Sequence, residues 1–251
     1  MTKPIQFKNL IIGSGIPKIC VPITACSKEE ICAQAVRVAD AGADLVEWRA
    51  DFFENLDNPE KTAEVLDAVS DILGQIPLLF TIRTAKEGGS KEMSAEEYAR
   101  CCLNAAKTGK ADMVDVEVFG EKEKKKELIQ KLHEASVKVI ASSHDFVKTD
   151  DKDVLLNRFK AMNETGADIL KMAVMPSDFT DVTAIMEATC EMQKYTDRPL
   201  VSMSMGKTGV ISRVAGESFG SCITFGAVGQ VSAPGQLPVK ELRMMLESLH
   251  G

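Results

Sequence analysis

Three segments of the chain repeat one pattern, in which a glycine is followed closely by Ala-Asp and then by an apolar run that carries charged residues. The segments are Gly42 to Arg49, Gly109 to Glu117 and Gly166 to Ala173. In each, the third residue after the aspartate is ionisable, which gives Glu47, Asp115 and Lys171. Because side chains alternate between the two faces of a strand, the equal offset places these three on equivalent faces. If the strands belong to one barrel, the three side chains share one interior layer.

A lysine among carboxylates inside a barrel suggests a catalytic role. Burying charge is unfavourable, and ionisable groups with perturbed pKa values gather at functional sites. The alternative is a structural ion pair of Lys171 with Glu47 or Asp115. Such pairs are rarely more stable than apolar packing. A desolvated lysine near other cations, in contrast, becomes a nucleophilic amine. We therefore interpret Lys171 as a nucleophile.

The whole chain alternates apolar runs with helical patterns, and no linker rich in Pro, Gly or Ser divides it. This order predicts a parallel sheet covered by helices. After a short hairpin around Ile5 to Ile12, strands are expected at 19–24, 44–49, 78–83, 112–118, 137–143, 168–174, 199–204 and 221–226. Helix signals lie between them, including the capping boxes that begin at Ser27 and Ser94. Eight strands in about 250 residues predict a single (β/α)8 TIM barrel domain over residues 1–251. The motif G-x-G-x-x-G is absent after the first strand, which disfavours a doubly wound dinucleotide fold.

Composition excludes several classes of function. The formal net charge of -7 argues against a nucleic-acid partner. No run approaches the roughly 18 apolar residues of a membrane span, and the N-terminus lacks a signal segment, so no membrane association and a cytoplasmic location are expected. The seven cysteines lack C-x-x-C spacing, which indicates reduced thiols. The three histidines lie too far apart in sequence for a recognisable metal site, so no metal is expected.

Polar residues gather where the expected strands end, which is where barrels of this kind carry their active sites. The candidates at or after strand ends are Glu47, Arg49, Arg83, Glu87, His144, Lys171, Arg213, Ser232 and Gln236. Together they supply an amine, a histidine, carboxylates and three arginines, which suit a small anionic polyhydroxylated carbonyl compound. The alternative for His144 is a histidine bonded to local backbone. Gly206-Lys207-Thr208 resembles the end of a P-loop, but Val201 stands where the first glycine is required.

Several motifs resemble type I 3-dehydroquinate dehydratase, the Schiff-base enzyme of the shikimate pathway. They are VEWRADFFEN, PLLFTIRTAKEGG, SSHDF, GADILKMAVMP, MSMGKTGVISRVAGESFGS and TFGAVGQVSAPGQ, in that order. The similarity runs from about Lys18 to Leu249, and this order across a whole barrel is far more specific than any one motif. The departures from the family pattern are Pro22, Ser143, Leu170 and Gly206, and none of them removes a residue with a catalytic role.

The resemblance implies that the protein converts 3-dehydroquinate to 3-dehydroshikimate by syn elimination. Lys171 would form the imine, His144 would act as general base and then general acid, and Glu87 would orient the imidazole. For substrate binding, the resemblance assigns the carboxylate to Arg213, Ser232 and Gln236, and the ring hydroxyls to Glu47, Arg49 and Arg83. It implies no metal and no cofactor, and it implies a homodimer.

Two other readings of the same residues stay open. One is a class I aldolase that uses Lys171, which would need a glycine-rich phosphate grip near the last two strands. The other is a non-catalytic barrel that binds a small anion, which would need the arginines alone. The stretch from Gln230 to Gln236 contains Gly235 and joins the last strand to its helix, so we expect it to act as a lid over bound substrate.

Overall fold

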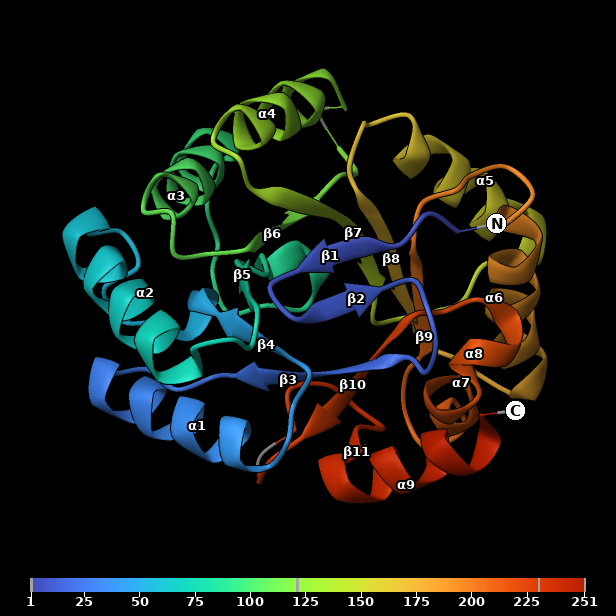
Figure 1. The fold of residues 1–251 in the computed structure, drawn as a ribbon. Helices are drawn as coiled ribbons and strands as arrows, with labels where there is room; N and C mark the ends of the chain where they lie inside the picture. Colours follow the sequence, from blue (N-terminus) through green and yellow to red (C-terminus); the bar gives the residue numbers. More distant parts are fainter. Residues whose placement is uncertain (1, 121, 230, 251) are drawn as a thin grey trace.

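A closed ring of parallel strands forms the centre of the molecule (Figure 1). The structure, a computed structural model, describes residues 2–120, 122–229 and 231–250. Within these residues the ring consists of β3 (Lys18–Ile23), β4 (Leu45–Arg49), β5 (Leu78–Thr81), β6 (Met113–Glu117), β7 (Lys138–Asp145), β8 (Ile169–Val174), β9 (Leu200–Ser204) and β10 (Ile223–Ala227). Each strand pairs in parallel with the next, β10 pairs with β3, and a bridge between Leu200 and Ser221 closes the ring. The predicted (β/α)8 barrel is confirmed.

The helices form an outer layer around this ring (Figure 1). They are α1 (Lys28–Asp40), α2 (Pro59–Leu73), α3 (Ala95–Lys107), α4 (Lys122–Glu134), α5 (Lys152–Asn163), α6 (Phe179–Met192), α7 (Val210–Val214), α8 (Gly216–Phe219) and α9 (Val239–Leu249). Ser94 and Glu97 form both bonds of a capping box, as predicted. At Ser27 the side chain accepts from the Glu30 backbone N–H, which is one half of the predicted box. The outward-facing side chains of the strands pack against these helices to form the larger core.

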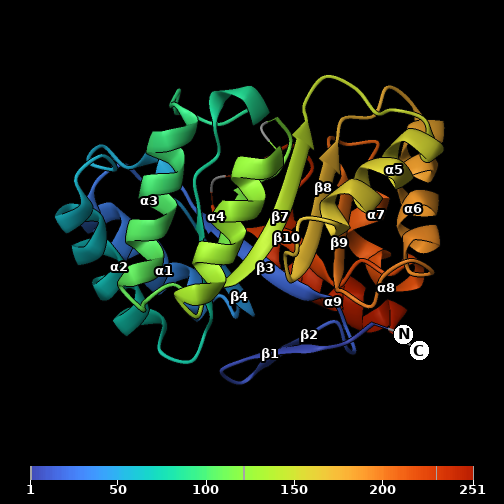
Figure 2. The same ribbon diagram turned by 90° about the horizontal axis from the view of Figure 1, so that it is seen from above.

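The predicted hairpin is confirmed as β1 (Ile5–Phe7) and β2 (Leu10–Ile12), which pair antiparallel. It lies across the end of the barrel where the strands begin, opposite the end at which they finish (Figure 2). Phe7 and Ile12 are buried among the apolar side chains of the barrel interior. These neighbours include Cys20, Leu45, Leu79, Met113, Ile140 and Ile169. The hairpin therefore plugs the amino end of the barrel with apolar packing.

Above this apolar layer the interior becomes polar. Moving two residues along β4 to β8 reaches Glu47, Thr81, Asp115, Ser142 and Lys171, which are all buried. Two residues further lie Arg49, Arg83, Glu117, His144 and Ala173. On these strands the interior thus changes from apolar at the plugged end to mostly polar near the open end, whereas β9 and β10 stay apolar.

The three repeated aspartates explain why these layers align. The carboxylates of Asp44, Asp112 and Asp168 accept the backbone N–H groups of Ile19, Leu78 and Val139, at 2.7, 2.8 and 2.9 Å. Each aspartate also donates its own backbone N–H to the carbonyl of that same residue. A paired bond of this kind fixes the register between a strand and its predecessor. The ionisable residue three positions later consequently reaches the same height in all three strands.

Several boundaries differ from those expected. β5 ends at Thr81 rather than at 83, because the backbone N–H groups of Arg83 and Thr84 turn away to side chains of Asp51 and Glu117. A two-residue strand, β11 (Leu237–Pro238), pairs with β10 and had no signal in the sequence. Two short turns of 3-10 helix follow strands, η1 (Ala50–Phe52) and η2 (Ala85–Glu87). None of the helices in the described part of the chain is long and apolar enough to cross a membrane.

Candidate active site

Lys171 lies midway along the barrel interior, on β8, with only 4% of its surface exposed. Its Nζ is 3.5 Å from Glu47 Oε1 on β4 and 3.5 Å from Asp115 Oδ2 on β6. The ring of Phe225 on β10 closes a further side, with its centroid 4.4 Å from Nζ. The amine is therefore held between two carboxylates, which the repeated pattern placed in the same layer, and an aromatic face, which the sequence did not indicate.

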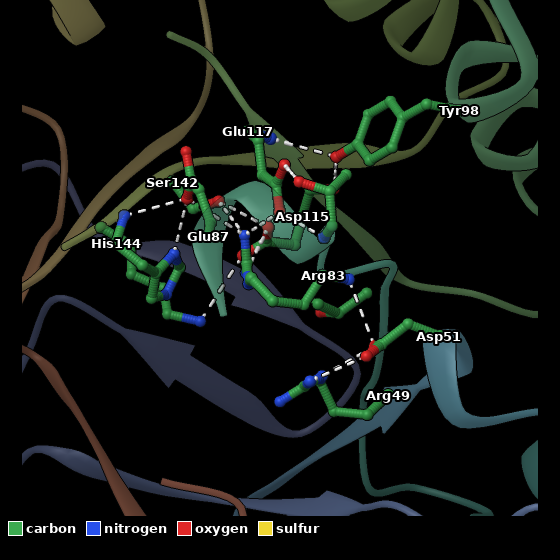
Figure 3. Close-up of polar contacts among 12 residues, drawn as sticks. Arg49, Asp51, Arg83, Glu87, Tyr98, Asp115, Glu117, Ser142 and His144 are labelled. Atoms are coloured by element: carbon green, nitrogen blue, oxygen red, sulfur yellow. Dashed lines mark hydrogen bonds and ion pairs between the residues drawn. The ribbon is translucent and has the colours of Figure 1, made fainter. Parts of the chain in front are cut away.

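Arg83 connects the buried carboxylates (Figure 3). Its Nη2 donates to Asp115 at 2.8 Å, and its Nη1 donates to Glu117 at 2.9 Å and to the Ser142 hydroxyl at 3.1 Å. Nη1 also lies 3.5 Å from Glu87. Both terminal nitrogens of this guanidinium are thus bound to protein groups.

The charge balance of this cluster keeps Asp115 ionised. Burial would raise the pKa of Asp115, but the cations of Arg83 and Lys171 and the Ser142 hydroxyl hold it below its ordinary value. Burial would likewise lower the pKa of Arg83, but Asp115, Glu117 and Glu87 raise it. Lys171 therefore faces a permanent negative charge on β6.

His144 stands on β7 one layer above Ser142, next to Ala173 of the neighbouring strand. Its Nδ1 lies 2.9 Å from Glu87 Oε2, and its backbone N–H donates to that same oxygen at 2.9 Å. The Phe146 ring stacks near the imidazole, with the centroids 6.5 Å apart. The carboxylate and the ring therefore restrict the plane of the imidazole.

The surroundings disfavour charge on both members of this pair. Burial lowers the pKa of His144 well below its ordinary value, and the cations of Arg83, Lys171 and Arg49 lower it further. Burial raises the pKa of Glu87 to about 8, and Glu117 and Asp115 add to this while Arg83 opposes it. At neutral pH the imidazole is thus unprotonated, which is the form that a general base requires.

A cavity of about 450 Å³, measured with its open mouth, contains most of the candidate residues. Its walls include Glu47, Arg49, Arg83, His144, Lys171, Arg213, Ser232 and Gln236. Glu87 lies behind His144 rather than in the wall. The structure thus brings all nine candidates to one site, eight in the wall and one behind it.

Arg213 is a buried cation on α7 that lacks a counterion. Only 1% of it is exposed, and no carboxylate in the described residues forms an ion pair with it. Its Nη2 donates to the Pro234 carbonyl at 2.9 Å and its Nη1 contacts Met203 Sδ at 3.5 Å, while Nε has no partner among the described residues. Burial lowers the pKa of Arg213 to about 10. A buried guanidinium of this kind suits an anionic group of a ligand.

The loop after β10 lies against Arg213. Gln236 Nε2 donates to the Ser232 hydroxyl at 3.0 Å, and the Ser232 backbone N–H donates to Gln236 Oε1 at 2.8 Å. Gly235 has a φ of +81°, and a Cβ there would lie 2.4 Å from the Gly206 carbonyl, so this close approach requires glycine. Gln230, where the expected lid begins, lies outside the described residues.

Comparison with known proteins identifies the chain. Residues 19–251 match the family model of type I 3-dehydroquinase. The chain belongs to the type I 3-dehydroquinase family. A 3-dehydroquinate dehydratase of Clostridioides difficile (strain 630) is 47% identical over 251 residues, covering 100% of this chain and 98% of that protein. One of Salmonella agona (strain SL483) is 43% identical over 249 residues, covering 99% of both.

Solved structures agree with this dehydroquinase assignment. A type I 3-dehydroquinate dehydratase from Clostridium difficile, crystallised with covalently modified comenic acid, has a TM-score of 0.96 at 47% identity. That comparison covers 100% of this chain and 99% of the other. A 3-dehydroquinate dehydratase from Enterococcus faecalis has a TM-score of 0.92 at 40% identity, covering 99% and 100%. The predicted family resemblance is confirmed.

The sequence analysis missed several residues of this site. Glu117 could have been predicted, because side chains two residues apart on a strand share a face. Glu117 is two residues after Asp115 and therefore lies one layer higher, in the layer of Arg83 and His144. Asp51 binds Arg49 through two bonds of 2.8 Å and was not predicted. Tyr98 of α3 reaches the backbone of β6 and gave no signal at all. A contact between a helix and a strand edge leaves no periodic trace in the sequence.

Proposed function

We propose that the protein dehydrates 3-dehydroquinate to 3-dehydroshikimate through an imine on Lys171. The observation that carries the proposal is the position of this buried amine, between Glu47 and Asp115 and in the same cavity wall as His144. The related enzymes are hydro-lyases with this substrate in their name. The crystal structure of the relative from Clostridium difficile contains covalently modified comenic acid.

Imine formation begins at the Lys171 amine. Attack on a ketone requires the unprotonated amine, and the Glu47 carboxylate, 3.5 Å from Nζ, would accept its proton while Asp115 stays ionised. Nζ bonds to C3 of the substrate, and the ketone oxygen leaves as water. The resulting iminium withdraws electrons from the neighbouring C2–H bond, which makes that proton removable. No metal or nucleotide is needed for this activation.

Elimination then uses one imidazole twice. His144 Nε2 removes the C2 proton while Nδ1 donates to Glu87, whose carboxylate stabilises the imidazolium that forms. The same imidazolium protonates the C1 hydroxyl, which leaves as water, and the C1–C2 double bond forms. Water finally hydrolyses the conjugated iminium, which releases 3-dehydroshikimate and restores Lys171.

Substrate binding would divide between the two sides of the cavity. We assign the substrate carboxylate to Arg213, because it is a buried cation without a carboxylate partner in the described chain. Ser232 and Gln236, which bond to each other in the structure, would turn to the same carboxylate. Arg49, Arg83 and Glu47 would contact the ring hydroxyls from the opposite wall.

The two alternatives are less well supported. An aldolase on phosphorylated sugars would need a glycine-rich phosphate grip, but this side of the cavity offers Arg213 of α7 and two neutral side chains of the loop after β10, Ser232 and Gln236. The barrel also resembles 3-hexulose-6-phosphate synthase with a TM-score of 0.62, but at 18% identity this likeness concerns the fold alone. A simple anion-binding barrel would not require the bonded pair of His144 and Glu87.

The decisive experiment is borohydride trapping with 3-dehydroquinate, combined with an absorbance assay for the conjugated product. We expect inactivation that depends on substrate and a mass increase on the peptide that contains Lys171. Lys171→Met should show neither turnover nor label, whereas Lys110→Met, at an exposed salt bridge outside the barrel, should behave as wild type. Full activity in Lys171→Met would end the imine mechanism, and no turnover by wild type would end the proposal.

Two further expectations, the homodimer implied by the family resemblance and the cytoplasmic location inferred from the sequence, remain predictions. A homodimer can be tested by light scattering coupled to size exclusion. A cytoplasmic location can be tested by fractionation of the source cells.

A further inference from the structure

The pairing between β5 and β6 stops before the active site. Leu79 pairs with Met113 and Phe80 with Val114, and no further pair follows. Continued register would place Ile82 opposite Val116. In a parallel ladder the Ile82 N–H would then donate to the Asp115 carbonyl, and the Ile82 carbonyl would accept the Glu117 N–H. Because β5 turns away after Thr81, these two groups of β6 need another partner.

The hydroxyl of Tyr98 supplies both missing bonds (Figure 3). It donates to the Asp115 carbonyl at 3.2 Å and accepts from the Glu117 backbone N–H at 3.0 Å. Tyr98 is 2% exposed, and Lys125 Nζ of α4 lies 4.2 Å from the centroid of its ring. One side chain from α3 thus takes the place of one peptide group in the sheet.

The replacement of these sheet bonds by Tyr98 matters because the turn of β5 allows Arg83 and Thr84 to bind the side chains of β6. Once β5 leaves the ladder, Thr84 donates to Glu117 through its backbone N–H at 2.8 Å and its hydroxyl at 2.7 Å. Arg83 meanwhile enters the barrel and binds the side chains of Asp115 and Glu117. Asp115 and Glu117 therefore bind Tyr98 through their backbone and Arg83 through their side chains.

We propose that Tyr98 is a positioning residue for the acid-base pair of the reaction. Its hydroxyl fixes the backbone of Asp115 and Glu117, these fix Arg83, and Arg83 lies 3.5 Å from Glu87, which orients His144. Tyr98 itself does not line the substrate cavity. This inference rests on the proposed function, since it assigns a task within that reaction.

The test is Tyr98→Phe, which keeps the ring and removes only the hydroxyl. We expect kcat to fall roughly ten- to a hundredfold, because small displacements of catalytic groups have effects of this size. KM should change by less than about twofold, because Tyr98 makes no contact with the cavity. The ionisation of Glu87 in the pH profile of kcat/KM should move upward, because the nearby cation of Arg83 is held less closely.

A matched control separates positioning from stability. Thr189 of α6 is equally buried, and its hydroxyl bonds to the Ile185 carbonyl and the Ser202 hydroxyl, each at 2.6 Å. Thr189→Val removes a buried helix-to-strand hydroxyl that has no link to His144. We expect it to lower unfolding stability as Tyr98→Phe does, and to leave kcat and the pH profile unchanged.

A second variant keeps the inference testable if Tyr98→Phe does not fold. Tyr98 and Tyr195 are the two tyrosines of the chain, so fluorotyrosine incorporated in a Tyr195→Phe background labels Tyr98 alone. Fluorination keeps the hydroxyl but weakens it as an acceptor, so kcat should fall by about twofold or more. A wild-type kcat and pH profile in the folded variants would overturn this inference alone. Wild-type protein that does not turn over 3-dehydroquinate would instead overturn the proposed function.

Discussion

Replacing Arg213 with methionine should make the ligand-free protein more stable and the enzyme much less active. Burial lowers the pKa of Arg213 from its ordinary value to about 10, so the folded state disfavours its charged form. At ~1.4 kcal/mol per unit, holding the charge costs about 3 kcal/mol at every pH well below 10. The bond to the Pro234 carbonyl returns about 1 to 2 kcal/mol of this. Arg213→Met should therefore raise the free energy of unfolding by about 1 to 2 kcal/mol.

The same substitution removes the proposed partner of the substrate carboxylate. Loss of a buried charge pair is worth about 3 to 4 kcal/mol, so kcat/KM should fall roughly a hundred- to a thousandfold. Urea unfolding and steady-state kinetics measure the two effects on one preparation. Arg243→Met is the control, because Arg243 pairs with Asp44 at the plugged end of the barrel. A kcat/KM within threefold of wild type would refute the carboxylate assignment, and a loss of stability would refute the argument from the unpaired cation.

Three further predictions concern the remaining parts of the site. His144→Ala should still form the imine but lose about 10²- to 10⁴-fold in turnover, so a covalent intermediate should accumulate in the mass spectrum. Activity should rise with pH through about 8 as Glu87 becomes the carboxylate that accepts from Nδ1, and Glu87→Gln should lose this rise and be slower throughout. Gln236→Ala should lower kcat/KM about ten- to a hundredfold, and hydrogen exchange of residues 231–236 should slow when substrate binds; equal exchange in both states would show a fixed wall rather than a lid.

The position of the buried lysine could be predicted from sequence because it depends on two simple regularities. The repeated Ala-Asp pairs set the strand registers, and the alternation of side chains along each strand decides which residues face the interior. Glu47, Asp115 and Lys171 meet for these reasons alone. The convergence of the other candidates followed from one rule, that the carboxyl ends of all the strands surround the same opening of the barrel.

The connections among those residues could not be predicted. Arg83 was expected at the substrate cavity, and it lies in the cavity wall, but the sequence did not indicate that its terminal nitrogens also bind Asp115 and Glu117 of β6. This arrangement exists because β5 leaves the sheet at Thr81, and no local propensity marks that departure. Likewise, nothing in the sequence indicates that Ser232 and Gln236 bond to each other across a turn.

The apolar plug formed by Phe7 and Ile12 has a consequence for the order of events in catalysis. With one end of the barrel filled, substrate, product and the water released by elimination must all pass through the mouth at the other end. Product cannot leave through the opposite end of the barrel while new substrate enters through the mouth. Product must leave the cavity before the next substrate can bind, so its release is a necessary step of every turnover. We therefore expect 3-dehydroshikimate to compete directly with 3-dehydroquinate for the site.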